Sequence, residues 1–262
     1  MRSGKVAAAF AVLLVVSFAV MNAMPSDTLP ATLLQEAVLA LVAFAAVGFA
    51  IPDALKRCTQ TVQQRSIVRF TAISLLLVGL VGGAITLLAW LFAGGGTMAC
   101  FASTALPSTA DLMENLLLLL GICLLTGLYE ESFMRVLGIE AFERALDTKR
   151  AILASAALFA LLHVGALDVS AGQLVLLQAV LKFGQALLFS VILGALYVRT
   201  RRLWPCAFIH AGFDVLYLAP NVLLTGTMPE TYASGAVGDT VLLAVSVLML
   251  SGVVLKIRKE IA

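Results

Sequence analysis

Eight long runs of apolar residues occupy most of this 262-residue chain and leave only short polar connections between them. The runs cover residues 6–24, 31–51, 70–92, 111–134, 151–165, 172–198, 203–218 and 236–255. A helix needs about 20 predominantly apolar residues to cross a bilayer. A chain that is 61% hydrophobic and 12% charged is also too apolar for a water-soluble domain. The sequence therefore predicts an all-α, polytopic membrane bundle of about eight transmembrane helices.

Most lysines and arginines fall in every second connection. Of the 17, Lys182 lies inside the sixth run. The other 16 precede the first run, follow the eighth, or lie between the second and third, fourth and fifth, or sixth and seventh runs. Because cytoplasmic loops carry an excess of basic residues, we expect both termini in the cytoplasm of an integral protein of a bacterial cell membrane. The first run resembles a signal peptide but exceeds its usual apolar length, so we expect an uncleaved helix.

The chain is expected to form a single integral-membrane domain, residues 1–262. Residues 1–110 supply three N-terminal helices, 111–218 carry the polar motifs, and 219–262 add an outer loop and the last helix. Its four cysteines show no CxxC spacing, which argues against structural zinc or a disulfide framework. The net charge of +2 gives no reason to expect nucleic acid as a partner. The sequence gives no oligomeric state.

Ionisable side chains inside the apolar runs point to a functional site, because a charged group near the bilayer centre costs roughly 2.5 kcal/mol or more. The fourth run ends with Glu130, Glu131 and Arg135, of which Glu131 and Arg135 share a helical face. An interfacial ion pair explains these two but leaves Glu130, about 100° round the helix, without a role. A carboxylate in that position can act as a general base.

Both histidines of the chain lie inside apolar runs. His163 ends the fifth run and, taken alone, is more typical of hydrogen-bonded packing than of a ligand or catalyst. His210 lies one helical turn from Asp214 in the seventh run. Two imidazoles together with nearby carboxylates are the ingredients of a site that activates water, with or without a metal.

Three short polar motifs thus follow one another along the chain: Glu130-Glu131-x-x-x-Arg135, Phe159-x-x-x-His163 and His210-x-x-x-Asp214. They resemble the ordered motifs of the CPBP family of intramembrane proteases, which includes the type II CAAX prenyl proteases and bacteriocin-processing proteins. The resemblance covers roughly residues 113–218. It implies an eight-helix bundle with a cavity open towards the cytoplasm, where a glutamate-activated water hydrolyses a bond of a peptide or membrane-protein substrate.

Carried over by motif, the resemblance implies a catalytic set of Glu130, Glu131, His163, His210 and Asp214, supported by Arg135 and Phe159. Glu130 would be the base, His163 would position the water or a metal, and His210 with Asp214 would stabilise the oxyanion. Family members often have Asn where this chain has Asp214. Since an ionised carboxylate cannot donate as an amide does, we expect Asp214 to orient His210 or to bind metal.

A divalent metal such as zinc is compatible with the same residues. Glu131, His163 and His210 could supply three ligands and leave a fourth position for water. No HExxH motif occurs, however, and a metal-free glutamate mechanism is equally compatible.

Two further polar features have structural interpretations. Gln178, Lys182 and Gln185 form a polar stripe in the sixth run, and we expect Lys182 to form a structural ion pair or to snorkel to the surface. Glu36 in the second run is expected near the outer membrane surface.

Two other functions remain open. A non-catalytic membrane partner, such as an immunity protein, would keep the helices without needing the polar residues. A proton-coupled transporter would use buried acids and histidines, but no inverted repeat is visible, and the buried acids are expected to cluster toward one side of the membrane rather than at its midplane.

Overall fold

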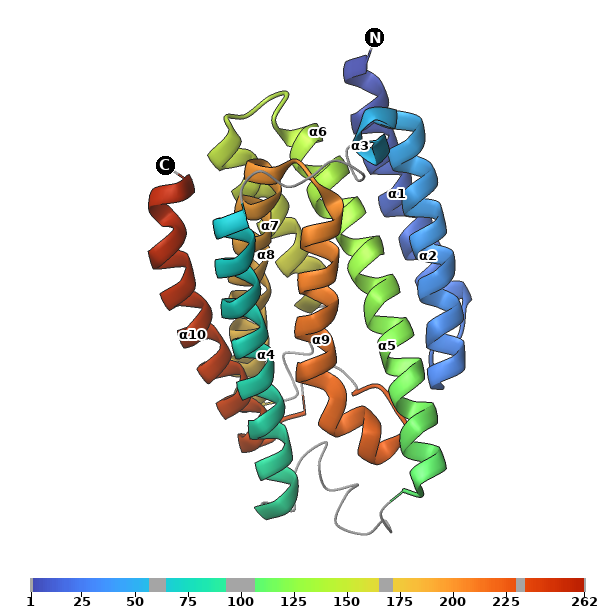
Figure 1. Cartoon of the computed structure of the whole chain (residues 1–262), viewed down its shortest axis with the longest axis vertical. Helices are drawn as coiled ribbons and strands as arrows, with labels where there is room; N and C mark the ends of the chain where they lie inside the picture. The colour runs from blue at the N-terminus through green and yellow to red at the C-terminus, as the bar shows by residue number, and fades with distance from the viewer. Residues whose placement is uncertain (1, 57–64, 93–106, 165–171, 230–233, 262) are drawn as a thin grey trace.

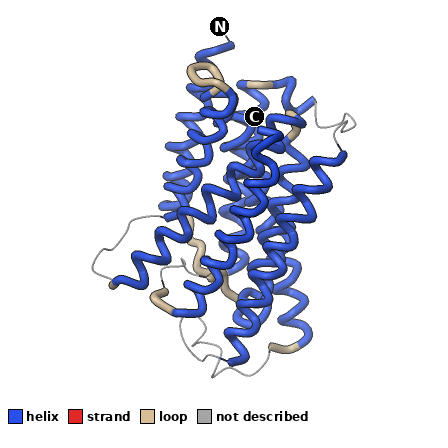
Figure 2. Tube along the Cα trace, turned by 90° about the vertical axis from the view of Figure 1, so that its left-hand side faces the viewer, coloured by secondary structure: helices blue, strands red, loops and turns tan. Residues whose placement is uncertain are grey.

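The protein is a bundle of helices, seen in a computed structural model that describes residues 2–56, 65–92, 107–164, 172–229 and 234–261. Within these ranges the chain is helical apart from short connections, and no strand occurs (Figure 2). The elements are α1 (Arg2–Ala23), α2 (Leu29–Ala50), α3 (Pro52–Lys56), α4 (Arg65–Phe92), α5 (Thr109–Glu131), the π-helix η4 (Ser132–Ile139), α6 (Glu140–Phe142), α7 (Thr148–Val164), α8 (Gln173–Thr200), α9 (Leu203–Thr225) and α10 (Val237–Ile261).

The predicted fold class, a polytopic all-α bundle, is confirmed. Seven helical segments in the described part of the chain are long and apolar enough to cross a membrane. The remaining predicted run corresponds to α7, which has 17 residues. Two predicted ends were wrong. The run expected to stop at residue 134 continues through η4 and α6, so that Thr109–Phe142 forms one 34-residue segment. The run expected to stop at residue 218 continues to Thr225 through Pro220.

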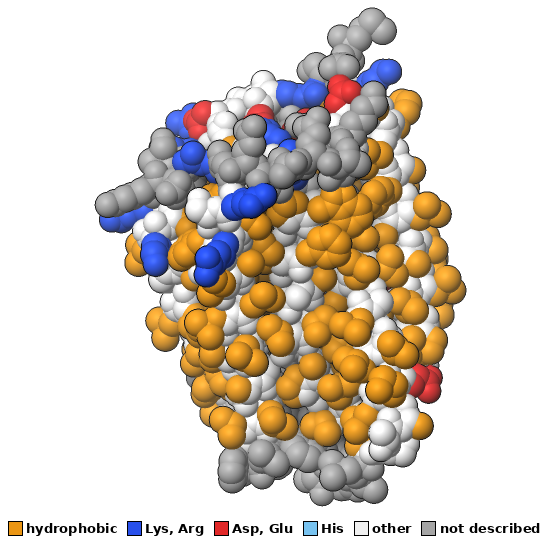
Figure 3. Space-filling model, in the orientation of Figure 1, with side chains coloured by type: hydrophobic (Ala, Val, Ile, Leu, Met, Phe, Trp, Pro, Cys, Tyr) orange, Lys and Arg blue, Asp and Glu red, His pale blue; other side chains and the backbone are white. Residues whose placement is uncertain are grey.

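The helices contact one another in a closed circuit. Around it, α1 packs on α2, α2 on α5, α5 on α9, α9 on α4, α4 on α10, α10 on α8, and α8 on α7, while η4 touches both α7 and α1. Both termini lie at the same end of the bundle (Figure 1). Figure 3 shows lysine and arginine side chains gathered at that end and hydrophobic side chains covering the flank. This distribution fits a membrane-spanning bundle; that the basic end is cytoplasmic remains a prediction.

An ion pair at the basic end fixes the turn between α8 and α9. Arg201 ends α8 in the left-handed region, with φ 50°, and its guanidinium donates two hydrogen bonds of 2.7 Å to the carboxylate of Glu143, which follows α6. Partial burial raises the pKa of Glu143, but the hydrogen bonds and the charge of Arg201 outweigh it and hold that pKa below its usual range. The start of α9 is thereby tied to the end of α6.

A close approach of α5 and α9 depends on a glycine. A methyl group at Gly127 would lie 2.6 Å from the carbonyl oxygen of Ala207, inside van der Waals contact. Because that oxygen belongs to the backbone of α9, a side chain at Gly127 would have to push the two helices apart. Small residues at helix contacts are a common means of close packing inside membranes.

We predict that Gly127→Ala lowers stability by about 1–3 kcal/mol, as overpacking of a close contact does. Thermal unfolding of the purified protein in detergent measures the effect. Gly252→Ala is the matched control, since Gly252 lies in α10 and a methyl group there meets nothing within 4 Å. That change should be neutral or slightly stabilising, because alanine favours a helix more than glycine does. Equal unfolding temperatures for Gly127→Ala and the parent protein would contradict the close approach.

The topology is tested by reporter fusions. Fusions after Lys149, Arg202 and the C-terminus should report the cytoplasm, and fusions after Gly95 and Glu230, which lie outside the described residues, should report the outer side. A cytoplasmic report at Gly95 would overturn the orientation and the count of eight helices.

Candidate active site

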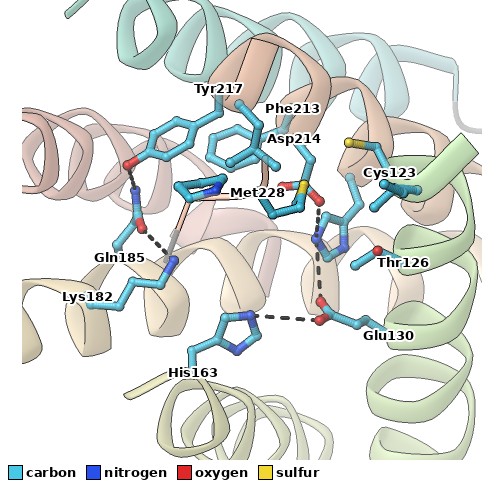
Figure 4. Close-up of a pocket in the computed structure, with 14 residues that line it drawn as sticks. Cys123, Thr126, Glu130, His163, Lys182, Gln185, Phe213, Asp214, Tyr217 and Met228 are labelled. Carbon is cyan, nitrogen blue, oxygen red and sulfur yellow. Dashed lines mark hydrogen bonds and ion pairs between the residues drawn. The ribbon is translucent and has the colours of Figure 1, made fainter. Parts of the chain in front are cut away.

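A cavity of about 220 Å³ lies between α5, α7, α8 and α9. Four of the predicted catalytic side chains line it: Glu130, His163, His210 and Asp214. They come from three different helices, and Figure 4 shows Glu130, His163 and Asp214 directed into the same space. Glu131 does not line the cavity; it is completely buried behind it.

The site lies deep in the bundle because α5 does not end at the glutamates. Beyond Glu131 the chain continues as η4, all eight residues of which are buried, and then as α6. Glu130 lies 12 residues before the end of α6 at Phe142, and His163 lies 15 residues after the start of α7 at Thr148. Because the chain continues as helix beyond Glu131, Glu130 can meet His163 without a special tilt of α7.

The buried acids were expected to cluster toward one membrane face, which counted against a transporter. Their position in the membrane stays a prediction. The π-helical segment η4 directly follows Glu131. This also points to a functional site near the glutamates, because π-bulges often occur at functional sites.

A buried ion pair holds one of the histidines. Arg135 Nε lies 3.0 Å from Glu131 Oε2, and neither side chain is exposed to solvent. The other oxygen of the carboxylate, Oε1, lies 2.8 Å from His210 Nδ1. Because a carboxylate paired with arginine acts only as an acceptor, His210 Nδ1 donates this bond. The ring is thus oriented with Nε2 facing the cavity.

Aromatic rings pack around the same groups. The guanidinium of Arg135 lies 4.7 Å from the centre of the Phe159 ring, whose centre is 4.1 Å from that of His163. Phe189 meets the His210 ring edge to face, with the ring centres 4.8 Å apart. Phe159 therefore contacts the ion pair on one side and a cavity histidine on the other, which fits the supporting role expected for it.

Glu130 faces both histidines across short gaps. Its Oε1 is 3.8 Å from His163 Nε2, and its Oε2 is 3.5 Å from His210 Nε2. Asp214 Oδ2 is 3.3 Å from the same His210 nitrogen. Within the described residues Glu130 Oε2 has no hydrogen-bond partner. Polar groups separated by such distances are commonly bridged by water.

The hydrogen-bonding role of His163 follows from its other nitrogen. Nδ1 lies 2.9 Å from the carbonyl oxygen of Phe159. A carbonyl accepts, so Nδ1 carries the hydrogen, and in the neutral ring Nε2 is an acceptor. Glu130 Oε1 and His163 Nε2 can therefore accept the two hydrogens of one water molecule. Such a water would keep its lone pairs available for attack on a carbon atom.

The metal site expected from Glu131, His163 and His210 does not fit this arrangement. Both Glu131 oxygens are engaged, with Arg135 and with His210 Nδ1, so Glu131 cannot join a ligand set on the cavity side of the imidazoles. Among the residues the structure describes, no group of three or more His, Cys, Asp or Glu side chains could hold a metal ion.

Several site residues could not be read from the sequence. Thr126 and Cys123 line the cavity from α5, but a threonine or cysteine in an apolar run gives no signal of its own. Glu36 was expected near the outer surface, which stays a prediction; its carboxyl contacts Thr126, which lines the cavity. Hydropathy alone does not show which neighbouring helix covers a residue.

The comparison with protein families bears on the same segment. Residues 112–216 match the model of a type II CAAX prenyl endopeptidase, Rce1-like. The family resemblance is confirmed. This match supports assignment to the CPBP and CAAX protease family, and the matched range contains all seven motif residues. No curated protein matches the chain. The matched segment includes the four motif residues that line the cavity, ends one residue before Tyr217, and leaves α1, α2, α4 and α10 outside.

Removing the buried arginine should destabilise the protein. We predict that Arg135→Ala costs about 3–5 kcal/mol, because it leaves the Glu131 carboxylate buried without its partner. The control is Arg150→Ala. Arg150 and Asp147 form an ion pair at 3.3 Å with side chains 75% and 56% exposed, and exposed pairs contribute little. Unfolding temperatures in detergent that shift equally for both variants would contradict the structural role of the buried pair.

Proposed function

We propose that the protein is an intramembrane endopeptidase in which Glu130 activates a water molecule. The observation that carries the proposal is the convergence of Glu130, His163 and His210 on one cavity within an Rce1-like segment. The predicted catalytic residues come together from separate helices, which packing alone would not require. A non-catalytic membrane partner has no need of this arrangement.

In the proposed reaction, the water donates its hydrogens to Glu130 Oε1 and His163 Nε2. Its oxygen attacks the carbonyl carbon of the scissile peptide bond while Glu130 takes one proton, as a general base. Glu130 then passes this proton to the nitrogen of the leaving amine as the C–N bond breaks. The carboxylate returns to its starting state, and the products are a carboxylic acid and an amine.

The oxyanion formed in this step is stabilised by His210. With Nδ1 donating to Glu131, a protonated ring can donate from Nε2 to the negatively charged oxygen. Asp214, 3.3 Å from Nε2, orients the ring and supports its positive charge. Preorganised donors of this kind typically contribute about 100-fold to 1000-fold in rate. Asp214 therefore acts through His210, as expected for a residue that cannot donate as asparagine does.

The substrate is a peptide or membrane protein. A bacterial cell is not expected to prenylate proteins, so we infer that the substrate is not a CAAX protein. We also infer that the cavity is reached from the cytoplasmic side, where the basic connections lie. The match to a protease family favours hydrolysis over proton-coupled transport.

The decisive test is the loss of activity in Glu130→Gln. Purified protein in lipid nanodiscs is given pools of unmodified and prenylated peptides, and cleavage is followed by mass spectrometry. The change removes the base without a change of size, so we predict at least a 1000-fold lower kcat with an unchanged unfolding temperature. Glu114→Gln is the matched control: it makes the same change at an exposed position near the start of α5 and should retain full activity.

Unchanged cleavage by Glu130→Gln would remove Glu130 from the mechanism. Activity that disappears with a chelator and returns with added zinc would replace the metal-free mechanism. Peptide pools left intact by the parent protein, together with proton uptake in proteoliposomes, would favour the transporter.

A further inference from the structure

A row of three polar side chains forms the side of the cavity that faces the carboxylates. Lys182 Nζ donates to Gln185 Oε1 at 3.2 Å, and Gln185 Nε2 donates to the hydroxyl of Tyr217 at 3.0 Å. All three residues line the cavity. Figure 4 shows them on one side, with Glu130 on the other.

Lys182 does not behave as a snorkelling residue. It lies nine residues into α8, about 14 Å from the Gln173 end at 1.5 Å per residue. Its side chain lines the cavity instead of extending along the lipid-facing surface, so the snorkelling alternative was wrong, while a structural ion pair stays a prediction. A lysine at this depth is costly unless it faces a polar or water-filled space, and such residues usually mark a functional path.

The neighbours of Lys182 fix its direction. Gln185 and Tyr217 are each 4% exposed, and the two hydrogen bonds determine which end of the Gln185 amide faces the ammonium. An ammonium carries three hydrogens and can hold more than one acceptor at once. Binding to Gln185 is therefore compatible with a further acceptor supplied by a ligand.

The cavity consequently has a side with acidic groups and an opposite side with a basic group. Glu130 and Asp214 repel an anionic group, whereas Lys182 attracts one, and both effects are strengthened where water is scarce. A peptide that places its scissile bond at Glu130 would lie with any carboxylate on the side of Lys182.

We propose that Lys182, oriented by Gln185 and Tyr217, binds a carboxylate of the substrate and so determines which peptides are cleaved. The proposal rests on the proposed endopeptidase function. The carboxylate comes either from the chain end of the peptide or from an acidic side chain, since the chemistry recognised is the same. Gln185 and Tyr217 are positioning residues that act through the lysine.

Binding to the inactive variant Glu130→Gln tests the proposal without turnover. The probes are three pools of fluorescent apolar hexapeptides: one with free carboxyl ends, the same pool amidated, and an amidated pool with one glutamate in each peptide. Affinities are measured by fluorescence anisotropy in nanodiscs. We expect at least one carboxylate pool to bind about tenfold or more tightly than the neutral amidated pool, as for a hydrogen bond between charged groups. Tighter binding of the pool with free carboxyl ends would show that Lys182 binds the chain terminus. Tighter binding of the glutamate pool would show that it binds an acidic side chain.

Three changes on the wall of the cavity provide the controls. In the same background, Lys182→Met should abolish the difference between pools, and Lys182→Arg should retain most of it. Tyr217→Phe should reduce it partially, because Gln185 loses the acceptor that orients it. Equal affinities for all pools in the parent background would overturn the proposal, and so would a preference that survives Lys182→Met in a folded protein. The comparison of pools in the parent background needs no change at Lys182 and stands even if that variant does not fold.

Kinetics separate substrate binding from a role in the chemistry. In the active protein, Lys182→Met should raise KM for the carboxylate substrate about tenfold or more and leave kcat within a few-fold. A loss confined to kcat would show that Lys182 stabilises the transition state and would overturn the proposal. If Glu130→Gln cleaves peptides normally, the endopeptidase mechanism fails, while the binding comparison still decides whether Lys182 recognises a carboxylate.

Discussion

The buried pair between Glu131 and Arg135 is the interaction on which the site depends. Two opposite charges are removed completely from solvent, which is costly unless other contacts compensate for the lost hydration. The second carboxylate oxygen accepts a hydrogen bond from His210 Nδ1. The guanidinium lies over Phe159, and among the described residues its nitrogens have no hydrogen-bond partner. The pair therefore does more than hold η4 in the bundle: it orients one cavity histidine directly and contacts the ring that packs on the other.

The continuation of α5 explains how adjacent glutamates take different roles. Glu131 faces the packed interior and Glu130 faces the cavity, as expected for neighbours about 100° apart on a helix. If the helix ended after Glu131, both carboxylates would lie near the membrane surface and could be solvated there. Because it continues through η4 to Phe142, both remain deep in the bundle, and each must be satisfied by protein groups or by water in the cavity.

The helices and the motif residues could be predicted from the sequence. The position of these residues along the bundle could not, and neither could the side of the cavity formed by Lys182, Gln185 and Tyr217. Apolar runs indicate that a helix is present, because backbone groups inside a bilayer must form their hydrogen bonds within the protein. They do not show that a helix continues past Arg135, because charged residues normally mark its end. Lys182 stood out in the sequence as a charged residue inside an apolar run. Its direction depends on Gln185 and on Tyr217, 32 residues further along the chain, and no local pattern reports that contact.

Helix α9 connects the two sides of the cavity. His210, Asp214 and Tyr217 follow one another at spacings of four and three, so they form one stripe along a single face of the helix. The first two belong to the carboxylate side, and Tyr217 orients the cationic side through Gln185. The close approach at Gly127 fixes the distance between this helix and the one that carries Glu130. A shift or rotation of α9 would therefore move His210, the proposed oxyanion donor, together with Tyr217, which orients Lys182 through Gln185.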